Sequence, residues 1–466
     1  MEPAPASDRE MPECARTAAR LRTLGAVDLA GATLNGAGCF DKLVPAMSIS
    51  QSGRQRVLDA LSHREGGVPL DFGSTSVTGI HATVVAALRQ HYGLERRPVR
   101  IHEPMQMLGL VDDDLARAMG VDTIGVPRRR AHFGLMFDRW KPWRFRDLDV
   151  EVSADFNVTE ADNGDILMHP QGDITIPPSG RMPKDGFFFD AIVRQNHFDP
   201  EHLDPADNLE EFQLYPDEDI EWIRSAVAGV QGRDRAVAAS FGGTGFGDIA
   251  AVPGVGLKDP RGIRDITEWY VSLRSRRAYI HAVFERQCET AIRNLERIHA
   301  AVGEQVDVVY LCGTDFGTQT SAFCSVGTFR ELWLPYYKAI CQWIHANTQW
   351  KCFKHSCGSV ERFLESFIEA GFDILNPVQC SAVGMEPAEL KRKYGDRLVF
   401  WGGGVDTQST LPFGTPQQVA DEVRRRCEVF ARGGGFVFNA VHNIQAGTPV
   451  ANIVAMLDAV KEFRNG

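Results

Sequence analysis

The sequence predicts a (β/α)8 barrel that carries a β-hairpin insertion and an N-terminal extension. Two observations predict this fold class. From about residue 235 to the end of the chain, short apolar runs alternate with amphipathic helical stretches, a pattern typical of parallel strands joined by crossover helices. Six such strand–helix units, with one or two more upstream, approach the eight of a closed barrel. A doubly wound open sheet is the alternative that the same alternation allows.

The first part of the chain differs from the rest. Residues 1–46 are dominated by Ala, Gly, Pro and Thr and lack apolar periodicity. We expect them to form a loosely ordered extension ahead of a barrel over residues 47–466. Ser52 is a suitable cap for a helix over 53–63, and an apolar run predicts a strand over 68–72.

The next segments lead into a strand-rich region. Helical periodicity predicts helices near 77–92 and 104–119, followed by a strand over 121–126. Residues 131–190 then change character, because turns of Asp, Asn, Gly and Pro separate short alternating strands. We expect residues 131–190 to be the β-hairpin insertion.

The regular region contains six predicted strands, each followed by a predicted helix. These units are 235–242 with 276–301, 306–313 with 327–347, 350–358 with 359–370, 373–379 with 386–394, 397–404 with 415–432, and 436–442 with 449–463.

Composition narrows the class of partner. The formal net charge of −11 argues against nucleic acid or an anionic membrane surface as the main partner. No apolar run approaches the roughly 18 residues of a membrane-spanning helix, and the start of the chain does not resemble a secretory signal. The ten cysteines are scattered without the spacing of a disulfide framework. We therefore expect a cytoplasmic protein with reduced thiols, some of them free to bind metal.

Candidate metal ligands follow two predicted strands. His355 and Cys357 are two positions apart at a strand end, so both point to one face. Imidazole and thiolate are the usual ligands of zinc, and a catalytic zinc takes three protein ligands. His442 ends the last predicted strand and returns to the same rim of a barrel, whereas Cys380, at the end of the adjacent strand, is the alternative third ligand. A packed strand end is the alternative to a metal site.

Other polar residues collect on the same predicted rim. Asp315 and Gln319 in GTDFGTQ are suited to a polar substrate, although a hydrogen-bonded helix entry explains them as well. Asp315 is also the candidate general base. Gln379 and Asn443 are further candidates for substrate binding because they follow predicted strands. The glycine-rich GGTGFGD matches neither the dinucleotide fingerprint nor a P-loop.

Several motifs together resemble the uroporphyrinogen decarboxylase superfamily. They are FGTQ, FRELWLPYYKAICQWIHA, HSCG, GFDILNPVQ, GGVDTQSTLPFGTPQQV and HNIQAGTPVANIVAM. The resemblance covers roughly residues 50–465 and is strongest to the corrinoid-linked branch of methylcobamide:coenzyme M-type methyltransferases. It implies a (β/α)8 barrel and a zinc ion held by His-x-Cys after one strand and by a cysteine after the last strand. The first two positions match His355 and Cys357.

The chain departs from that branch at two positions. His442 stands where the methyltransferases carry cysteine. Near the end of the ILNPVQ strand those relatives have an acidic residue, whereas this sequence has Val378–Gln379. A ligand set of two histidines and one cysteine carries one negative charge fewer, which leaves a zinc ion more electrophilic. The decarboxylase branch carries arginines in RQAGRYxPE, but the comparable PLDFGSTSVTGIH has none. Porphyrinogen decarboxylation is therefore disfavoured.

The expected function is zinc-dependent methyl transfer between a small-molecule thiol, hydroxyl or methyl ether and a corrinoid. No D-x-H-x-x-G segment is present, so we expect the corrinoid, as methylcobalamin, to be carried by a separate partner protein. A zinc-dependent lyase or hydrolase with Asp315 as general base, a decarboxylase on the same barrel, and a non-enzymatic binding protein are the alternatives.

Overall fold

The computed structural model describes residues 51–464, and residues from Gln51 onward form one compact unit. The expected extension over residues 1–46 lies outside the described residues. The first described helix, α1 (Gly53–Leu61), begins after Ser52, whose side chain accepts the N–H of Gln55 as predicted.

The centre of the fold is a seven-stranded parallel sheet in the order β16-β15-β14-β13-β12-β11-β4. Its strands are β4 (Thr123–Val126), β11 (Ala236–Ala239), β12 (Val308–Cys312), β13 (Lys351–His355), β14 (Ile374–Asn376), β15 (Val399–Trp401) and β16 (Phe436–Val437). Each lies within a strand that the sequence predicts. The parallel strands and crossover helices establish a mixed α/β fold.

The sheet curls so that one segment contacts both of its edges. Pro69 accepts the N–H of Phe438, and Asp71 donates to the carbonyl oxygen of Phe438, next to β16. On the other side, Leu70 accepts the N–H of Asp122, next to β4. The predicted strand over 68–72 is therefore present as a bridge between the two edge strands and not as a regular strand.

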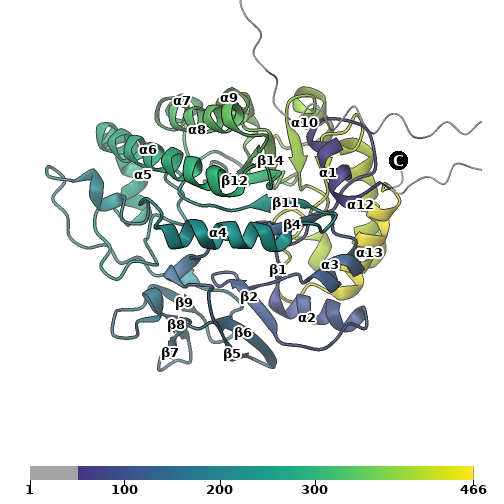
Figure 1. Cartoon of the computed structure of the whole chain (residues 1–466), viewed down its shortest axis with the longest axis horizontal. Helices are drawn as coiled ribbons and strands as arrows, with labels where there is room; N and C mark the ends of the chain where they lie inside the picture. The colour runs from purple at the N-terminus through teal and green to yellow at the C-terminus, as the bar shows by residue number, and fades with distance from the viewer. Residues whose placement is uncertain (1–50, 465–466) are drawn as a thin grey trace, which may run out of the picture. The chain divides into compact units, whose positions relative to one another are not determined.

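Helices cover the outer face of the sheet (Figure 1). They are α6 (Arg277–Val302), α7 (Val326–Leu332), α8 (Leu334–Asn347), α9 (Leu364–Ala370), α10 (Pro387–Tyr394), α12 (Pro416–Phe430) and α13 (Val450–Lys461). The predicted helix over 327–347 is two helices, since Pro335 cannot continue the hydrogen bonds of α7 into α8. Two further helices were not predicted: α4 (Asp217–Val230), which packs on β4 and α6, and α5 (Ile266–Ser275), which packs on α6.

The two predicted helices upstream of β4 are shorter than expected. Instead of residues 77–92, α2 covers Ala82–His91, because residues 80–81 form strand β1 and the His81 side chain caps the helix. The prediction of a helix over 104–119 is wrong in its first half. The buried Glu103 carboxylate accepts the N–H groups of Met105 and Gln106, which turns the chain, and α3 is limited to Asp113–Met119.

The strand-rich region forms two small sheets. One has the order β1-β3-β2-β6-β5 and joins β1 (Ile80–His81), β2 (Val99–Glu103) and β3 (Leu108–Gly109) to the hairpin of β5 (Trp140–Phe145) and β6 (Leu148–Ser153). The other contains β7 (Val158–Glu160), β8 (Ile166–Met168), β9 (Gly180–Met182) and β10 (Asp190–Ala191). In Figure 1, β5 to β9 lie at the lower edge of the view, beneath α4. Residues 131–190 therefore extend an upstream sheet and add a second one, which differs from a single inserted hairpin.

Side chains of the central strands alternate between two apolar clusters. Tyr310, Phe353 and Trp401 belong to the smaller cluster on the inner face, where the Phe353 and Trp401 rings lie 5.4 Å apart. Cys352 belongs to the larger cluster, which includes the covering helices. Because His355 is two positions after Phe353, the alternation places it on the inner face, at the carboxyl end of β13.

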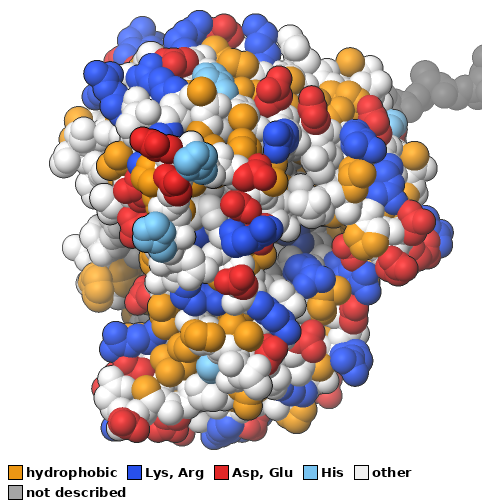
Figure 2. Space-filling view, turned by 90° about the vertical axis from the view of Figure 1, so that its left-hand side faces the viewer, with side chains coloured by type: hydrophobic (Ala, Val, Ile, Leu, Met, Phe, Trp, Pro, Cys, Tyr) orange, Lys and Arg blue, Asp and Glu red, His pale blue; other side chains and the backbone are white. Residues whose placement is uncertain are grey.

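The outer surface carries charges of both signs. Figure 2 shows acidic and basic side chains interspersed over one face, with no large patch of a single sign. Within residues 51–464, no helix combines the length and the apolar character that crossing a bilayer requires.

Candidate metal centre

The imidazole of His355 is oriented by a chain of buried hydrogen bonds. Its Nδ1 atom lies 2.5 Å from Oδ1 of Asn376, and the Nδ2 amide of Asn376 donates to the carbonyl oxygen of Trp401 at 2.7 Å. Because that donation fixes the Asn376 amide, its oxygen faces His355 and the proton of the ring lies on Nδ1. The Nε2 atom is left with a free lone pair.

Cys357 lies directly in front of that nitrogen. Its Sγ atom is 3.3 Å from Nε2 of His355. The backbone N–H of Cys357 donates to Oδ1 of Asp315 at 2.7 Å, and Gly358 donates to Oε1 of Gln379 at 2.8 Å. Ser356 points the other way and accepts the N–H of Phe316. The loop after β13 is therefore held on both sides of the thiol.

His442 reaches the same point from the loop after β16. Its backbone has a positive φ of 72°, a conformation uncommon for a residue other than glycine. The His442 and His355 rings lie 5.1 Å apart, and the ligand atoms of His355, Cys357 and His442 all lie within 4.8 Å of one another. Cys380 is not part of this group, because its sulfur faces the carbonyl oxygen of Val378 at 3.2 Å.

The three side chains are uncharged in this environment. Burial lowers the pKa of His355 to about 4 and that of His442 to about 3. Burial also raises the pKa of the Cys357 thiol well above its usual value, and the neighbouring Asp315 carboxylate raises it further. Neutral imidazoles offer lone pairs, and a bound cation is the factor that would favour the thiolate form of the cysteine.

The donor set fits a zinc ion at two of its three members without rearrangement. His355 presents the free Nε2 atom and Cys357 presents its sulfur beside it. At His442, the Nδ1 atom accepts the N–H of Asn443 at 2.7 Å, which leaves the ring proton on Nε2. The His442 ring must therefore turn or exchange its proton to become a ligand.

Two carboxyl groups adjoin these side chains. Oδ1 of Asp315 is 3.8 Å from Nε2 of His355, and about a quarter of the Asp315 side chain is exposed. Asp248, in the loop after β11, was not singled out in the sequence. Burial raises the pKa of Asp248, and the charge of Asp315 raises it further. Asp248 therefore retains its proton more readily than an exposed carboxyl group does.

The three predicted substrate-binding residues occupy different positions. Gln379 is 7% exposed and holds Gly358, as described above. Asn443 is 1% exposed, accepts the N–H of Gly79 and donates to the carbonyl oxygen of Ser76, so its side chain holds the loop before β1. Gln319 is exposed and its amide donates to Oε1 of Gln408 at 2.8 Å. Of the three, Gln319 alone has a side chain open to solvent.

Two buried residues that support the centre were missed in the sequence. Asn376 ends β14, and its place before a proline gave no indication of its contact with His355. Lys354 is completely buried, and its ammonium group donates to the carbonyl oxygens of Thr314 and His355. The ring of Phe316 lies 5.1 Å from that ammonium group. A lysine inside a predicted buried strand is the signal that could have identified it.

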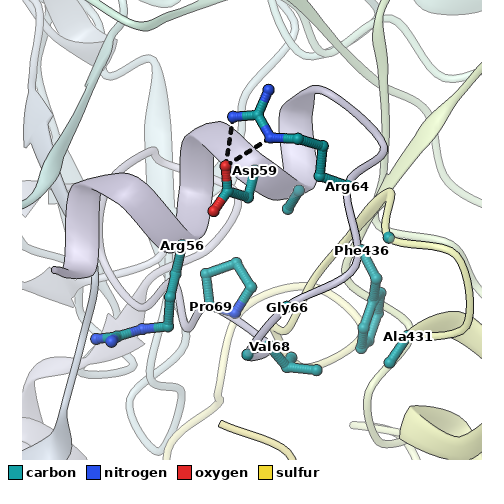
Figure 3. A pocket seen from close by; sticks show the side chains of 11 residues that line it. Arg56, Asp59, Arg64, Gly66, Val68, Pro69, Ala431 and Phe436 are labelled. Carbon is teal, nitrogen blue, oxygen red and sulfur yellow. Dashed lines mark hydrogen bonds and ion pairs between the residues drawn. The ribbon is translucent and has the colours of Figure 1, made fainter. Parts of the chain in front are cut away.

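A small pocket at the amino ends of the strands has no histidine or cysteine among the described residues that line it. Its lining includes α1 and the segment before Leu70, together with Ala431 and Phe436 (Figure 3). Its Asp59 and Arg64 side chains are paired with each other. The candidate ligands His355, Cys357 and His442 lie at the opposite, carboxyl ends of the strands.

Comparisons with known proteins match part of this chain to uroporphyrinogen decarboxylases. A family model described as uroporphyrinogen decarboxylase (URO-D) matches residues 260–463, which include all three candidate ligands. The uroporphyrinogen decarboxylase of Methylococcus capsulatus is 28% identical over 102 residues, covering 22% of this chain and 27% of that protein. That of Psychromonas ingrahamii is 32% identical over 88 residues, covering 18% and 24%. The matches thus span about a quarter of the length of these curated relatives.

One solved structure resembles this chain over more of its length than the curated relatives do. A methyltransferase from Methanosarcina mazei superposes with a TM-score of 0.51 at 17% sequence identity, covering 88% of this chain and 99% of that one. At that identity the likeness establishes a shared fold.

Proposed function

Because the chain belongs to the uroporphyrinogen decarboxylase superfamily, we propose that it is a zinc-dependent enzyme that transfers a methyl group between a small-molecule substrate and a corrinoid. The substrate would be a thiol, a hydroxyl compound or a methyl ether. The single observation that carries the proposal is the meeting of His355, Cys357 and His442 at the carboxyl ends of the parallel strands. In barrels of parallel strands this is the end where catalytic groups gather.

We also propose that the sheet closes into a complete barrel. Residues 68–72 would serve as its eighth strand, because they bond to the backbone beside both edge strands of the seven-stranded sheet. In that arrangement the loops after β13 and β16 face a common mouth.

His355, Cys357 and His442 would hold the zinc ion. A bound Zn²⁺ would lower the pKa of a substrate thiol or hydroxyl group, or polarise the oxygen of a methyl ether. The Asp315 carboxylate lies at the edge of this group and would accept the proton that the substrate loses. Asn376 and Asp315 would keep His355 and the Cys357 backbone in place.

The corrinoid would be supplied by a separate protein. In one direction, methylcobalamin would supply the methyl group that the substrate heteroatom takes up, and cobalt would keep the electron pair of the carbon–cobalt bond. The reverse reaction would demethylate a donor. The rim outside Asp315 and Gln319 is the side from which a corrinoid would have to approach.

A lyase, hydrolase or decarboxylase is the second candidate, and one observation favours it. The pKa of the buried Asp248 is raised by burial and by the charge of Asp315. A carboxyl group that keeps its proton is suited to act as a general acid.

Metal analysis followed by a corrinoid assay tests the proposal. The purified protein should contain about one zinc ion per chain at the rim, and the Cys357→Ser and His442→Ala variants should lose it. Cys380→Ala is the matched control and should retain it, because the Cys380 sulfur faces backbone carbonyl groups. Methylcobalamin mixed with the zinc-containing protein and candidate thiols should then change its visible absorption spectrum. Zinc at the rim without any such change, for methylcobalamin or for cob(I)alamin with methyl donors, would favour the lyase or hydrolase.

A further inference from the structure

A second group of metal-binding side chains lies between α8 and the sheet. His345 belongs to the last turn of α8, Cys352 is the second residue of β13, and Asp373 immediately precedes β14. Their ligand atoms lie within 4.8 Å of one another. Cys352 faces the helices near the amino end of β13, whereas His355 ends the same strand on the inner face. The two groups are therefore separate.

We propose that His345, Cys352 and Asp373 form a second cation site, which binds a thiophilic divalent metal ion such as Zn²⁺. This inference is independent of the proposed methyl transfer. Imidazole, thiolate and carboxylate are all first-choice ligands of zinc, and three of them leave one position for water. A cluster of exposed carboxylates would have no such preference for a thiophilic ion.

The geometry requires only a small adjustment. The Nε2 atom of His345 donates to Oδ2 of Asp373 at 2.8 Å. A tetrahedral ion bound to both atoms at about 2.0–2.1 Å would hold them roughly 3.3 Å apart, about half an ångström more than now. The His345 side chain is 39% exposed on the helix surface, so it has room to move.

Exposure also defines a route to the site. His345 and Asp373 are partly exposed, while Cys352 is completely buried behind them. An ion would enter past the imidazole and meet the thiol last. Burial raises the pKa of the Cys352 thiol well above its usual value, so a cation is needed to favour the thiolate.

The contacts present without metal prepare the ligands. Oδ2 of Asp373 accepts the N–H of Cys352 at 2.7 Å, and Oδ1 lies 3.3 Å from the Lys351 ammonium group. Asp373, followed by Cys352, raises the pKa of His345 to about 10. The ion would thus replace a proton shared by His345 and Asp373, and it would join α8 to β13 and β14.

Cobalt titration tests this site with the rim cluster disabled. In the double variant Cys357→Ser/His442→Ala, added Co²⁺ should still produce thiolate-to-cobalt absorption and saturate at one equivalent. Introducing His345→Ala should abolish that signal. Cys427→Ala is the control, because this buried cysteine on α12 belongs to neither group, and the signal should persist.

The melting temperature and a second His345 variant provide independent tests of the same site. Zn²⁺ should raise the melting temperature of the double variant, because it binds the native state alone, and His345→Ala should remove this rise. His345→Gln replaces the imidazole by an amide that retains a donor for Asp373 but is a poor zinc ligand, so it covers the case in which His345→Ala does not fold. Absence of thiolate-to-cobalt absorption in the double variant, or its persistence in both His345 variants, would overturn the proposal.

Discussion

The Nδ1 atom of His355 lies 2.5 Å from Oδ1 of Asn376, and this bond determines which ring nitrogen faces Cys357. Asn376 in turn is fixed by its donation to the carbonyl oxygen of Trp401. Trp401 is anchored through its indole N–H, which donates to the buried Asp71 carboxyl at 2.8 Å. The orientation of one candidate metal ligand thus depends on residues far from it in the sequence.

Replacing Asn376 should therefore weaken metal binding without removing a ligand. We predict that Asn376→Ala lowers the affinity for Zn²⁺ by about 10–100-fold, because the His355 ring loses the partner that holds its proton on Nδ1. Competition with a chromogenic chelator measures this change. Asn347→Ala, which removes an exposed amide from the end of α8, should leave the affinity unchanged. Equal affinities for Asn376→Ala and the native protein would show that the bond does not orient a ligand.

A second prediction concerns the segment that bridges the sheet edges. Asp122 is 2% exposed, accepts the N–H of Leu70, and pairs with Arg56 and Arg464. We expect Asp122→Ala to lower the free energy of unfolding by about 3–5 kcal/mol, since it leaves two largely buried guanidinium groups without their carboxylate. Urea denaturation measures the change.

The control for Asp122 is an exposed ion pair. Asp458 pairs with Lys461 on the surface of α13, and about half or more of each side chain is exposed. Asp458→Ala should change the free energy of unfolding by less than about 1 kcal/mol. A similar loss of unfolding free energy in both variants would mean that Asp122 stabilises the protein no more than an exposed ion pair does.

A third prediction concerns pH. His81 is completely buried, accepts the N–H of Thr83 at Nδ1 and lies 3.0 Å from the carbonyl oxygen of Phe187 at Nε2. Burial lowers the pKa of His81 to about 4, below the value of about 6.5 expected in the unfolded chain. The unfolded state therefore binds more protons, and stability falls as the pH decreases from about 6.5 toward 4.

At pH 5 this histidine alone should cost about 2 kcal/mol of stability relative to pH 7. In the His81→Asn variant, asparagine can still cap α2, so the loss of stability between pH 7 and 5 should become smaller by that amount. The buried His355 and His442 remain and keep part of the slope. Denaturation of the native protein and the variant at pH 7 and pH 5 measures the difference. The same loss of stability in both would contradict the role given to His81.

The strand–helix alternation could be predicted from the sequence because it depends on short spacings, and the meeting of the three candidate ligands could be predicted from their positions at strand ends. The short spacing brings Cys357 next to His355, although Cys357 lies in the loop just after β13, and the rim position of His442 follows from parallel topology. The contacts of Asn376, Lys354 and Asp248 depend on which strands pair and which loops meet in space, and residue spacing does not encode either.

The incorrect prediction of a helix at residues 104–112 has a local cause. Residues 104–112 have helical periodicity, but the buried Glu103 carboxylate takes the N–H groups that would begin a helix there. Substrate binding by Gln379 and Asn443 stays a prediction, and in this structure their amides hold backbone groups of neighbouring loops.

The last prediction concerns Asp315 in the proposed reaction. The Asp315 carboxylate accepts the N–H of Cys357 at 2.7 Å and lies 3.8 Å from Nε2 of His355. In Asp315→Asn, the amide oxygen can still accept that N–H, but the side chain can no longer take a proton. We expect the zinc content to be unchanged and the rate of methyl transfer to a thiol to fall by about 10²–10⁴-fold. Rates measured from the absorption of methylcobalamin should recover partly as the pH is raised, because the thiol then loses its proton without help. If the zinc content falls together with the rate, Asp315 acts as a metal ligand and not as the proton acceptor.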